Sequence, residues 1–307
     1  MARVACLASV SLLSRGRGSP REVFDRNVSA ALKLAGEAAL DEPDVICLPE
    51  AFPTAGLPLR EAVKLAEPIP NSVIEAFGGL AEEHWTYVVC PMLTAEGGSI
   101  YNSAVLIGRD GGVVGVYHKV YPTISEIEAG VRPGEAPVTF ETDLGRVGVA
   151  ICFDLNFDDV FEAYRRERVK VVFFPSAYPG GLQVLMRAHQ CACYFVTALL
   201  REGSMIVDPL GRVLAVSSDY SPVISVRVNL DFEVLHLDYN VAKVKRAKER
   251  YGARIAVEVS GPEGVMMLTS HSDEVSALDV VREFGMELRD EYFERSREAR
   301  ASTLSER

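Results

Sequence analysis

The chain has 307 residues, of which 48% are hydrophobic and 24% are charged. This balance is that of a globular protein with a sizeable core and little disorder. Acidic residues number 43 against 32 basic ones, and the net charge of -11 would repel nucleic acid and anionic membrane surfaces. Because of this charge, a nucleic-acid partner is not expected. No run of eighteen apolar residues occurs, so a membrane span is not expected either.

The first residues allow two interpretations. Met1 to Leu13 resembles a short signal peptide, with Arg3 ahead of an apolar run, but no convincing small-residue cleavage site follows. The run reads equally well as a buried first strand, which we favour. The six cysteines lie mostly inside apolar, strand-like runs rather than at disulfide or metal spacings. Reduced thiols in a cytoplasmic protein are therefore expected.

Local signals predict alternating strands and helices in the first third of the chain. A strand at residues 4–9 precedes a helix whose start is marked by Ser19, Pro20 and Glu22, a capping box with proline at the first helical position. Residues 45–48 are continuously apolar, as expected for a strand covered on both faces.

The pattern continues with another capping box and a hairpin. Ser72 with Glu75 is predicted to open a second helix, and the pair Gly111-Gly112 indicates a hairpin turn. The strands predicted in this part of the chain lie near residues 87–90, 104–107 and 113–117.

The second half shows the same mixture. Strands are predicted at residues 147–151, 171–174 and 195–199, with helices around 160–166 and 182–191 between them. A hairpin at residues 204–216 turns at Pro209-Leu210-Gly211. Residues 275–300 read as one amphipathic, heavily charged helix. Hairpins together with crossover helices predict mixed sheets covered by helices, in layers.

Three reactive side chains follow predicted buried strands: Glu50, Lys119 and Cys152. Strand ends of covered sheets are where sites assemble. Each residue alone has a commonplace explanation, as a solvated strand end or an inert core thiol. Together they supply a nucleophile, a base to take its proton and a cation to stabilise an oxyanion.

These segments and their surroundings resemble the nitrilase superfamily of carbon-nitrogen hydrolases. The similarity covers about residues 3 to 230, in the family's order. The segments that carry it are Ile46 to Phe52, Tyr117-His118-Lys119, Gly134 to Asp154, Phe174-Pro175-Ser176-Ala177 and Ile206 to Arg212.

The resemblance implies an α/β fold, a four-layer αββα sandwich, with a cysteine mechanism. Cys152 would attack to form a thioester, Glu50 would act as general base and then activate water, and Lys119 would stabilise the tetrahedral intermediate. The backbone N–H of Phe153 would be the second oxyanion donor. No metal or organic cofactor is implied, and the partners expected are a small-molecule substrate and further copies of the chain, as a homodimer or larger homo-oligomer.

Family members commonly carry a second glutamate shortly after the lysine. The seven-residue spacing from Lys119 favours Glu126, with Glu128 as the fallback, although both could be ordinary loop charges.

Four aromatic residues next to the proposed site could form its substrate-binding wall, although aromatic neighbours are just as often packing. They are Tyr121, Phe153, Phe157 and Tyr178.

The sequence departs from the family pattern after the nucleophile, where Phe157-Asp158-Asp159 replaces the common Phe-Pro-Glu. Asp158 could cap the helix that follows. Arg187 and His189 could recognise a carboxylate or could only pair with surface acids, and the two readings have equal support. Cys191 and Cys193 lack metal or redox spacing and are expected in the core.

We divide the chain into a carbon-nitrogen hydrolase domain, residues 1–252, and a C-terminal extension of that domain, residues 253–307. No family pattern is recognised in the extension. It could lie at a subunit interface.

The leading functional hypothesis is a hydrolase of a small amide or N-carbamoyl substrate. Cys152-Phe153-Asp154 favours the amidase and carbamoylase branches, whereas the position of Glu126 resembles nitrilases, so a nitrilase is the alternative. A catalytically silent ligand-binding homologue is a further alternative, against which the presence of all three central residues argues. A dinucleotide-binding protein is set aside because Gly16-Arg17-Gly18 lacks the third glycine of the phosphate fingerprint.

Overall fold

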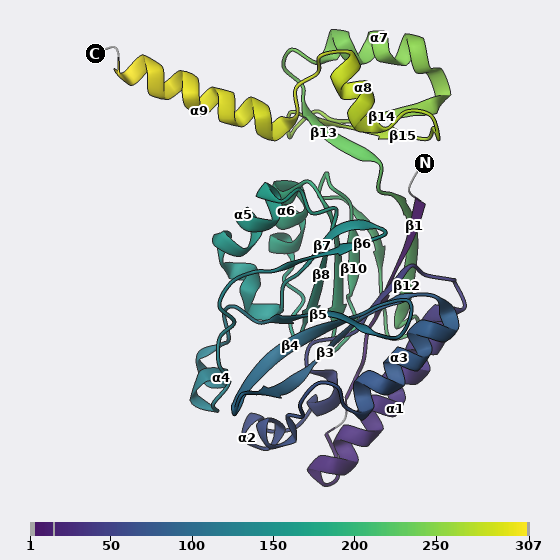
Figure 1. Ribbon diagram of the computed structural model, residues 1–307, viewed down its shortest axis with the longest axis vertical. Helices are drawn as coiled ribbons and strands as arrows, with labels where there is room; N and C mark the ends of the chain where they lie inside the picture. The colour runs from purple at the N-terminus through teal and green to yellow at the C-terminus, as the bar shows by residue number, and fades with distance from the viewer. Residues whose placement is uncertain (1–3, 15, 306–307) are drawn as a thin grey trace. The chain divides into compact units, whose positions relative to one another are not determined.

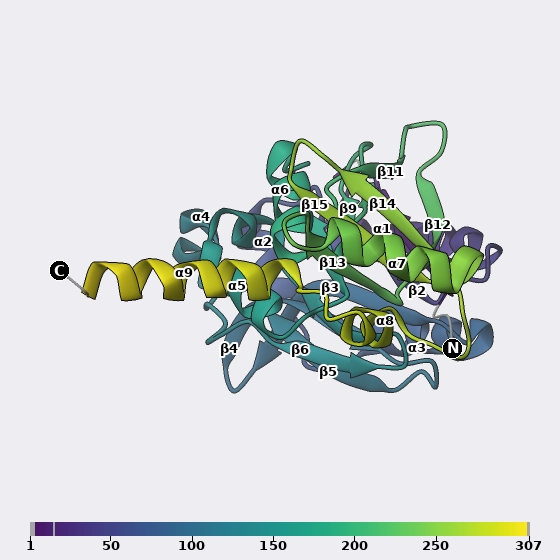
Figure 2. The ribbon, with the colours of Figure 1, turned by 90° about the horizontal axis from the view of Figure 1, so that it is seen from above.

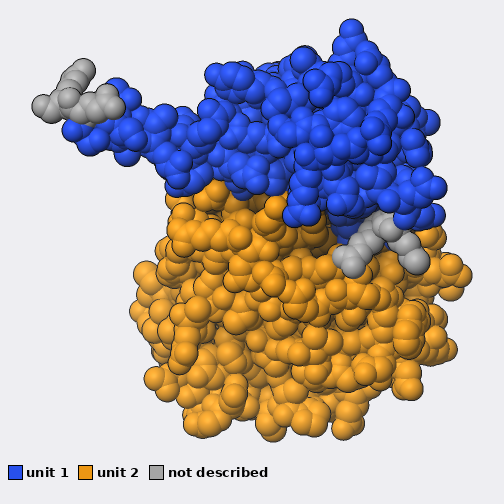
Figure 3. All heavy atoms as spheres, turned by 45° about the horizontal axis from the view of Figure 1, so that its top comes forward, with its two compact units in different colours: residues 1–4, 228–307 blue, residues 5–227 orange. Residues whose placement is uncertain are grey.

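The computed structural model describes residues 4–14 and 16–305, which form two compact units (Figure 3). The large unit comprises residues 5–227, and the small unit contains Val4 and the residues from 228 onwards. The predicted extension from residue 253 is thus part of a unit that starts earlier, because strand β13 (Phe232–His236) pairs with β15 (Val265–Ser270) across that boundary. A place for the extension at a subunit interface stays a prediction.

The large unit contains two six-stranded mixed sheets (Figure 1). In the first sheet the strand order is β12-β1-β2-β3-β4-β5, with β1 to β3 parallel. Its strands are β1 (Val4–Val10), β2 (Val45–Cys47), β3 (Tyr87–Glu96), β4 (Ser99–Ile107), β5 (Val113–His118) and β12 (Val223–Asn229). The predicted first strand is therefore confirmed.

The second sheet has the order β11-β10-β9-β8-β7-β6, with β7 to β9 parallel. Its strands are β6 (Thr139–Thr142), β7 (Gly145–Val149), β8 (Val171–Ser176), β9 (Tyr194–Leu199), β10 (Met205–Val207) and β11 (Val213–Val216). The two predicted hairpins, β4-β5 and β10-β11, are both present.

Helices cover the outer face of each sheet, which gives the expected α/β sandwich of four layers (Figure 1). Helices α1 (Pro20–Ala39) and α3 (Ser72–His84) share an apolar core with the first sheet. Helices α5 (Asp158–Arg166) and α6 (Leu182–Cys191) do the same for the second. The sheets face each other, and β2 contacts both β8 and β9.

Helix α1 begins as the sequence predicts. Ser19 and Glu22 form the capping box, and Pro20 is the first helical residue. One polar side chain on its inner face is buried: Asn27 donates to the carbonyls of Pro53 (3.1 Å) and Ala55 (2.9 Å). Because these carbonyls belong to the segment after β2, Asn27 fixes a loop that lies beside the functional site.

Helix α3 begins differently from the prediction. Ser72 is the first helical residue, and the cap is Asn71, whose Oδ1 accepts from the N–H groups of Val73 and Ile74, both at 3.1 Å. Asparagine is as good a cap as serine, so the local pattern with Glu75 pointed one residue too far.

Two short helices lie near the strand ends of the large unit, α2 (Leu59–Ala62) and α4 (Ile124–Glu128). Within the described residues, no helix is long and apolar enough to cross a membrane.

The small unit is a three-stranded antiparallel sheet, β13-β15-β14, with three helices. The remaining elements are β14 (Ile255–Ser260), α7 (Val241–Tyr251), α8 (Ala277–Glu283) and α9 (Arg289–Ser305), and Figure 2 shows α7 and α9 along their lengths.

The prediction of a single amphipathic helix at residues 275–300 is wrong, because two helices, α8 and α9, occupy this range. Gly285, at φ +57°, separates α8 from α9. The N–H of Gly285 bonds to the carbonyl of Arg282 and that of Met286 to Val281, a Schellman motif that ends α8. Most side chains of α9 are exposed on all sides, so this helix has no apolar face.

The two candidate caps of α3 can be separated by substitution. Asn71→Ala removes the acceptor for two N–H groups and should lower the free energy of unfolding by about 1 kcal/mol. Ser72→Ala is the control, and it should change stability by less than about 0.5 kcal/mol because the side chain is exposed. Urea unfolding followed by circular dichroism measures both, and a larger loss in Ser72→Ala would contradict the assignment.

Candidate active site

The ends of several strands meet at one pocket of about 300 Å³ in the large unit. Glu50 follows β2, Lys119 follows β5, Cys152 follows β7 and Ala177 follows β8. The structure thus brings the three sequence-predicted residues together, two from the first sheet and one from the second.

Lys119 is the charged centre of the site. Its Nζ lies 2.8 Å from Oε1 of Glu50 and 2.8 Å from Oε2 of Glu126, and its side chain is 1% exposed. Burial alone would lower the pKa of Lys119, but the negative charges around it outweigh burial and raise that pKa. The ammonium therefore stays charged, with two of its three N–H donors directed at described carboxylates.

Asn102, on β4, joins the two carboxylates. Its Nδ2 donates to Oε1 of Glu50 at 2.9 Å and to Oε1 of Glu126 at 2.8 Å. Both partners are acceptors only, so the orientation of this amide follows from its contacts. The sequence reading missed Asn102 because an asparagine inside a strand carries no distinctive local signal.

Glu126 has two tasks. Besides binding Lys119, its Oε2 accepts from the backbone N–H of Thr123 at 2.7 Å, as the third residue of a capping box that opens α4. Burial would raise the pKa of Glu126, but Lys119 and the hydrogen bonds hold it below the usual value. Glu128, the fallback, is exposed. The motif Thr-x-x-Glu was visible in the sequence and would have favoured Glu126 on its own.

Cys152 is the first residue of a short 3₁₀ helix (Cys152–Asn156) and has a φ of +49°. A non-glycine residue rarely adopts this left-handed conformation, which is common at functional sites. Burial raises the pKa of the thiol to about 12, with a further increase from Glu50 that Lys119 only partly offsets. The resting sulfur is therefore a neutral thiol and needs a base to become a nucleophile.

Glu50 is placed to be that base. Its Oε1 accepts hydrogen bonds from Lys119 and Asn102, whereas its Oε2 accepts one from the backbone N–H of Ala177 at 2.9 Å. The Ala177 contact comes from the second sheet, so the carboxylate is held from both sheets and cannot rotate freely.

Asp154 ties the nucleophile segment to the lysine segment. It is fully buried, and its Oδ2 accepts from the N–H of Ile151 (2.8 Å) and the hydroxyl of Tyr117 (2.7 Å). Its Oδ1 accepts from the N–H of Tyr121 at 2.7 Å. Burial raises the pKa of Asp154 to about 6, although these hydrogen bonds lower it.

Gly134 allows a loop to close against the lysine strand. Its N–H bonds to the carbonyl of Lys119 at 2.8 Å. A Cβ at this position would lie 2.3 Å from the backbone oxygen of His118. A side chain is excluded there, so glycine is required for the backbone contact that fixes Lys119.

The four predicted wall residues do not line the pocket of about 300 Å³. Tyr121 stacks on Phe157 at 3.7 Å between ring centroids, and Phe153 meets Phe157 edge to face. The hydroxyl of Tyr178 is buried without a hydrogen-bond partner among the described residues. A role for these four in substrate binding, and for the Phe153 N–H as an oxyanion donor, stays a prediction.

Arg187 has a structural partner rather than a place in the pocket. It donates to the carbonyl of Leu155 through Nε and Nη2, and Nη1 lies 2.6 Å from Asp158. Asp158 forms an ion pair with Arg187. It is the first helical residue of α5, after the cap position at Phe157, so the expectation that Asp158 caps the helix is wrong. Together the two residues anchor the chain that leaves the nucleophile.

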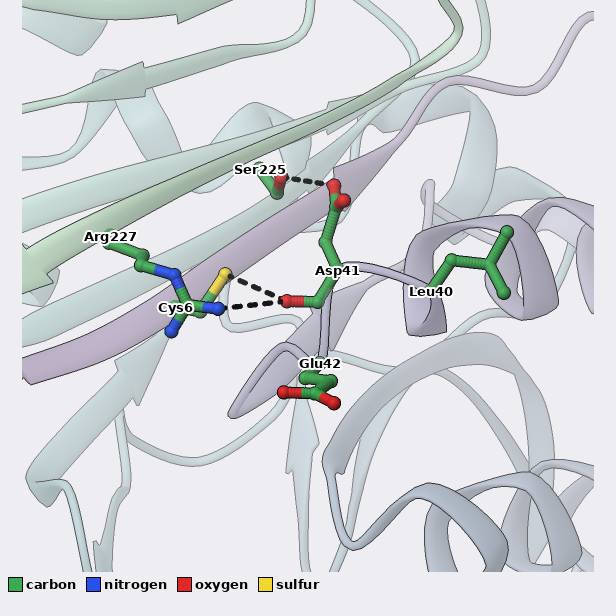
Figure 4. Close-up of a pocket in the computed structure, with 6 residues that line it drawn as sticks. All are labelled: Cys6, Leu40, Asp41, Glu42, Ser225 and Arg227. Atoms are coloured by element: carbon green, nitrogen blue, oxygen red, sulfur yellow. Dashed lines mark hydrogen bonds between the residues drawn. The ribbon is translucent and has the colours of Figure 1, made fainter.

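The remaining cysteines lack this environment. All six are free and buried. Cys6 lines a separate hollow with Asp41 and Arg227, where its sulfur lies 3.9 Å from the carbonyl oxygen of Asp41 (Figure 4). Burial raises the pKa of Cys6 as well, and no described lysine and glutamate pair faces it. Cys191 and Cys193 belong to the core between sheet and helices, as expected.

Comparison with known proteins agrees with this geometry. The family model "Carbon-nitrogen hydrolase" matches residues 9–233. Omega-amidase NIT2 of Xenopus tropicalis is 26% identical over 68% of this chain and 85% of its own length. Deaminated glutathione amidase of Homo sapiens is 28% identical over 67% of this chain and 73% of its own.

A solved structure supports the fold. Saccharomyces cerevisiae Nit3, a member of the nitrilase superfamily, superimposes with a TM-score of 0.64 at 22% identity, covering 74% of this chain and 90% of that one. These matches confirm the resemblance and the fold class inferred from the sequence.

The buried Asp154 should give stability a specific pH dependence. Its pKa is raised to about 6 from 3.8, so ionising it costs more in the folded than in the unfolded chain. Its contribution to stability is therefore fully present below about pH 4 and is lost as the pH rises towards 6, by up to about 3 kcal/mol. Asp154→Asn cannot ionise, so relative to wild type the variant should gain stability over this interval.

Urea unfolding of wild type and Asp154→Asn from pH 4 to pH 8 measures the difference. Parallel stability curves across this range would contradict the assignment, since every other titrating group is common to both proteins.

Proposed function

Because the chain belongs to the carbon-nitrogen hydrolase family, we propose that it hydrolyses a small amide or N-carbamoyl compound through a thioester on Cys152. The observation that carries the proposal is the arrangement of Glu50, Lys119 and Cys152 in one pocket, with Glu126 behind the lysine. The relatives named omega-amidase and deaminated glutathione amidase act on amides, which supports an amide as the substrate.

In the first step the Cys152 thiol transfers its proton to Glu50 as the sulfur attacks the carbonyl carbon. This coupling is needed because a thiol with a pKa of about 12 is almost entirely protonated near neutrality. Collapse of the tetrahedral intermediate breaks the carbon-nitrogen bond, and the leaving amine takes the proton from Glu50. The product remaining on the enzyme is the thioester.

Water completes the reaction. Glu50, again a carboxylate, takes a proton from a water molecule that attacks the thioester, and the sulfur leaves as the acid product forms. The proton returns to the sulfur, so one water is consumed and ammonia or an amine is released. Ala177 and Asn102 keep Glu50 in one orientation through both steps.

Lys119 provides the charge that the intermediate requires. Glu50 and Glu126 accept two of its three N–H donors, so the third is available for the oxyanion. A permanent cation in a buried site needs no reorganisation when the oxyanion forms, which is the basis of electrostatic catalysis. Glu126 positions the lysine without contacting the reacting atoms.

The same residues could act on a nitrile, since the thiol would add to the nitrile carbon in the same way. Three substrate classes therefore form the test: primary amides, N-carbamoyl amino acids and nitriles. We expect ammonia release from the amide or N-carbamoyl class by the wild-type protein. Release from nitriles alone would replace this proposal by the nitrilase alternative.

Cys152→Ala should abolish ammonia release from every substrate and leave the circular dichroism spectrum unchanged, because only the sulfur is lost. Cys6→Ala is the matched control: it removes a thiol outside the pocket and should retain activity. In wild type, mass spectrometry after rapid acid quenching should find an acyl group on the peptide that contains Cys152. Full activity in Cys152→Ala would refute the mechanism.

Lys119→Ala should lower kcat at least about a hundredfold, as expected for loss of one oxyanion donor. Because the change also leaves two buried carboxylates unpaired, folding is checked by near-UV circular dichroism. Steady-state kinetics with the best substrate give the value. A folded variant with a loss of less than tenfold would restrict Lys119 to a structural role.

A further inference from the structure

Most side chains that line the pocket around Cys152 are apolar. Apart from the catalytic groups already described, Asn102 and the hydroxyls of Thr54 and Thr123, the described lining is aliphatic or backbone. The four large apolar side chains are Leu57, Leu59, Leu93 and Leu200, and the small ones belong to Ala51, Ala55, Ala62 and Ala177.

The polar groups in the lining are already occupied within the protein. The hydroxyl of Thr54 donates to the carbonyl of Ala51, and that of Thr123 donates to Glu126. Lys119 and the two glutamates are bound to one another. The exception among the described lining side chains is Oδ1 of Asn102, which has no hydrogen-bond partner. As an acceptor it cannot bind a carboxylate, so apart from it only the groups needed for the reaction remain to receive a polar part of the substrate.

The charge of the lining has a definite sign. Glu50 and Glu126 contribute two negative charges and Lys119 one positive charge, while the thiol is neutral. A carboxylate on the substrate would enter a site with a surplus negative charge and no further described cation in its lining. Burying an uncompensated charge is strongly unfavourable, whereas each buried methylene group is favourable.

The volume of the pocket also favours a small substrate. A volume of about 300 Å³ is at the lower limit of ordinary ligand sites. The space suits a short chain of carbons next to the reacting carbonyl.

We infer that the enzyme selects a short, uncharged aliphatic acyl group, and that the lining of leucines and alanines, with no counter-charge, rejects an acyl group ending in a carboxylate. This selectivity rests on the proposed function and assigns the substrate class within it. N-carbamoyl amino acids, which carry a carboxylate, are accordingly poor substrates.

The test, on the full chain, compares three amides that share a four-carbon acyl chain. Butyramide carries a terminal methyl, succinamate carries a carboxylate in its place, and the methyl ester of succinamate restores neutrality while keeping the oxygen atoms. We expect kcat/KM for butyramide to exceed that for succinamate at least about tenfold, with the ester much closer to butyramide. A ratio below tenfold, or a preference for succinamate, would overturn the inference.

A pair of variants tests the electrostatic cause. Leu57 is half-buried at the pocket, so a longer side chain can be accommodated there. Leu57→Lys should lower the ratio of butyramide to succinamate at least about tenfold relative to Leu57→Met, which has similar bulk and no charge. Equal ratios in the two variants would overturn the inference.

Failure of the proposed function gives a different result. In that case none of the three amides releases ammonia and no acyl group is found on Cys152, which would overturn the function and the selectivity together. Turnover with the opposite selectivity would leave the function intact and remove only the inference about the acyl group.

Discussion

The buried ion cluster around Lys119 is the interaction on which the rest of the site depends. Three charged groups are removed from water there, at a cost that is recovered only if every charge is paired and hydrogen-bonded. Glu50, Glu126 and Asn102 meet this condition from three different elements: the segment after β2, α4 and β4. The same contacts that satisfy the charges also hold the base and the cation at fixed positions, so stability and preorganisation have one origin.

Catalytic geometry arises between the two sheets rather than within either one. Glu50 and Lys119, the proposed base and cation, follow strands of the first sheet, whereas Cys152, the proposed nucleophile, follows a strand of the second. Asp154 connects the two by binding the backbone of both segments, and the N–H of Ala177 reaches across to Glu50. The left-handed conformation of Cys152 is maintained by this surrounding network, since the residue itself does not favour it.

Reactivity and selectivity are assigned to different parts of the pocket. The polar groups at its floor bind one another and are arranged for attack on a carbonyl, which any small amide would offer. The walls are aliphatic and lack charge, so they can distinguish substrates only by the size and polarity of the group next to that carbonyl.

Residues whose role is local could be predicted from the amino-acid sequence. Buried strands ending in Glu50, Lys119 and Cys152, the capping box at Ser19 and the two hairpins all follow from patterns a few residues long. Two other features could be recognised only in the folded chain: the buried acceptor role of Asp154 and the bridge through Asn102. Both depend on contacts between segments far apart in the chain. The strand order of the first sheet brings Asn102 to Glu50, and the packing of the two sheets brings Asp154 to Tyr117 and Tyr121.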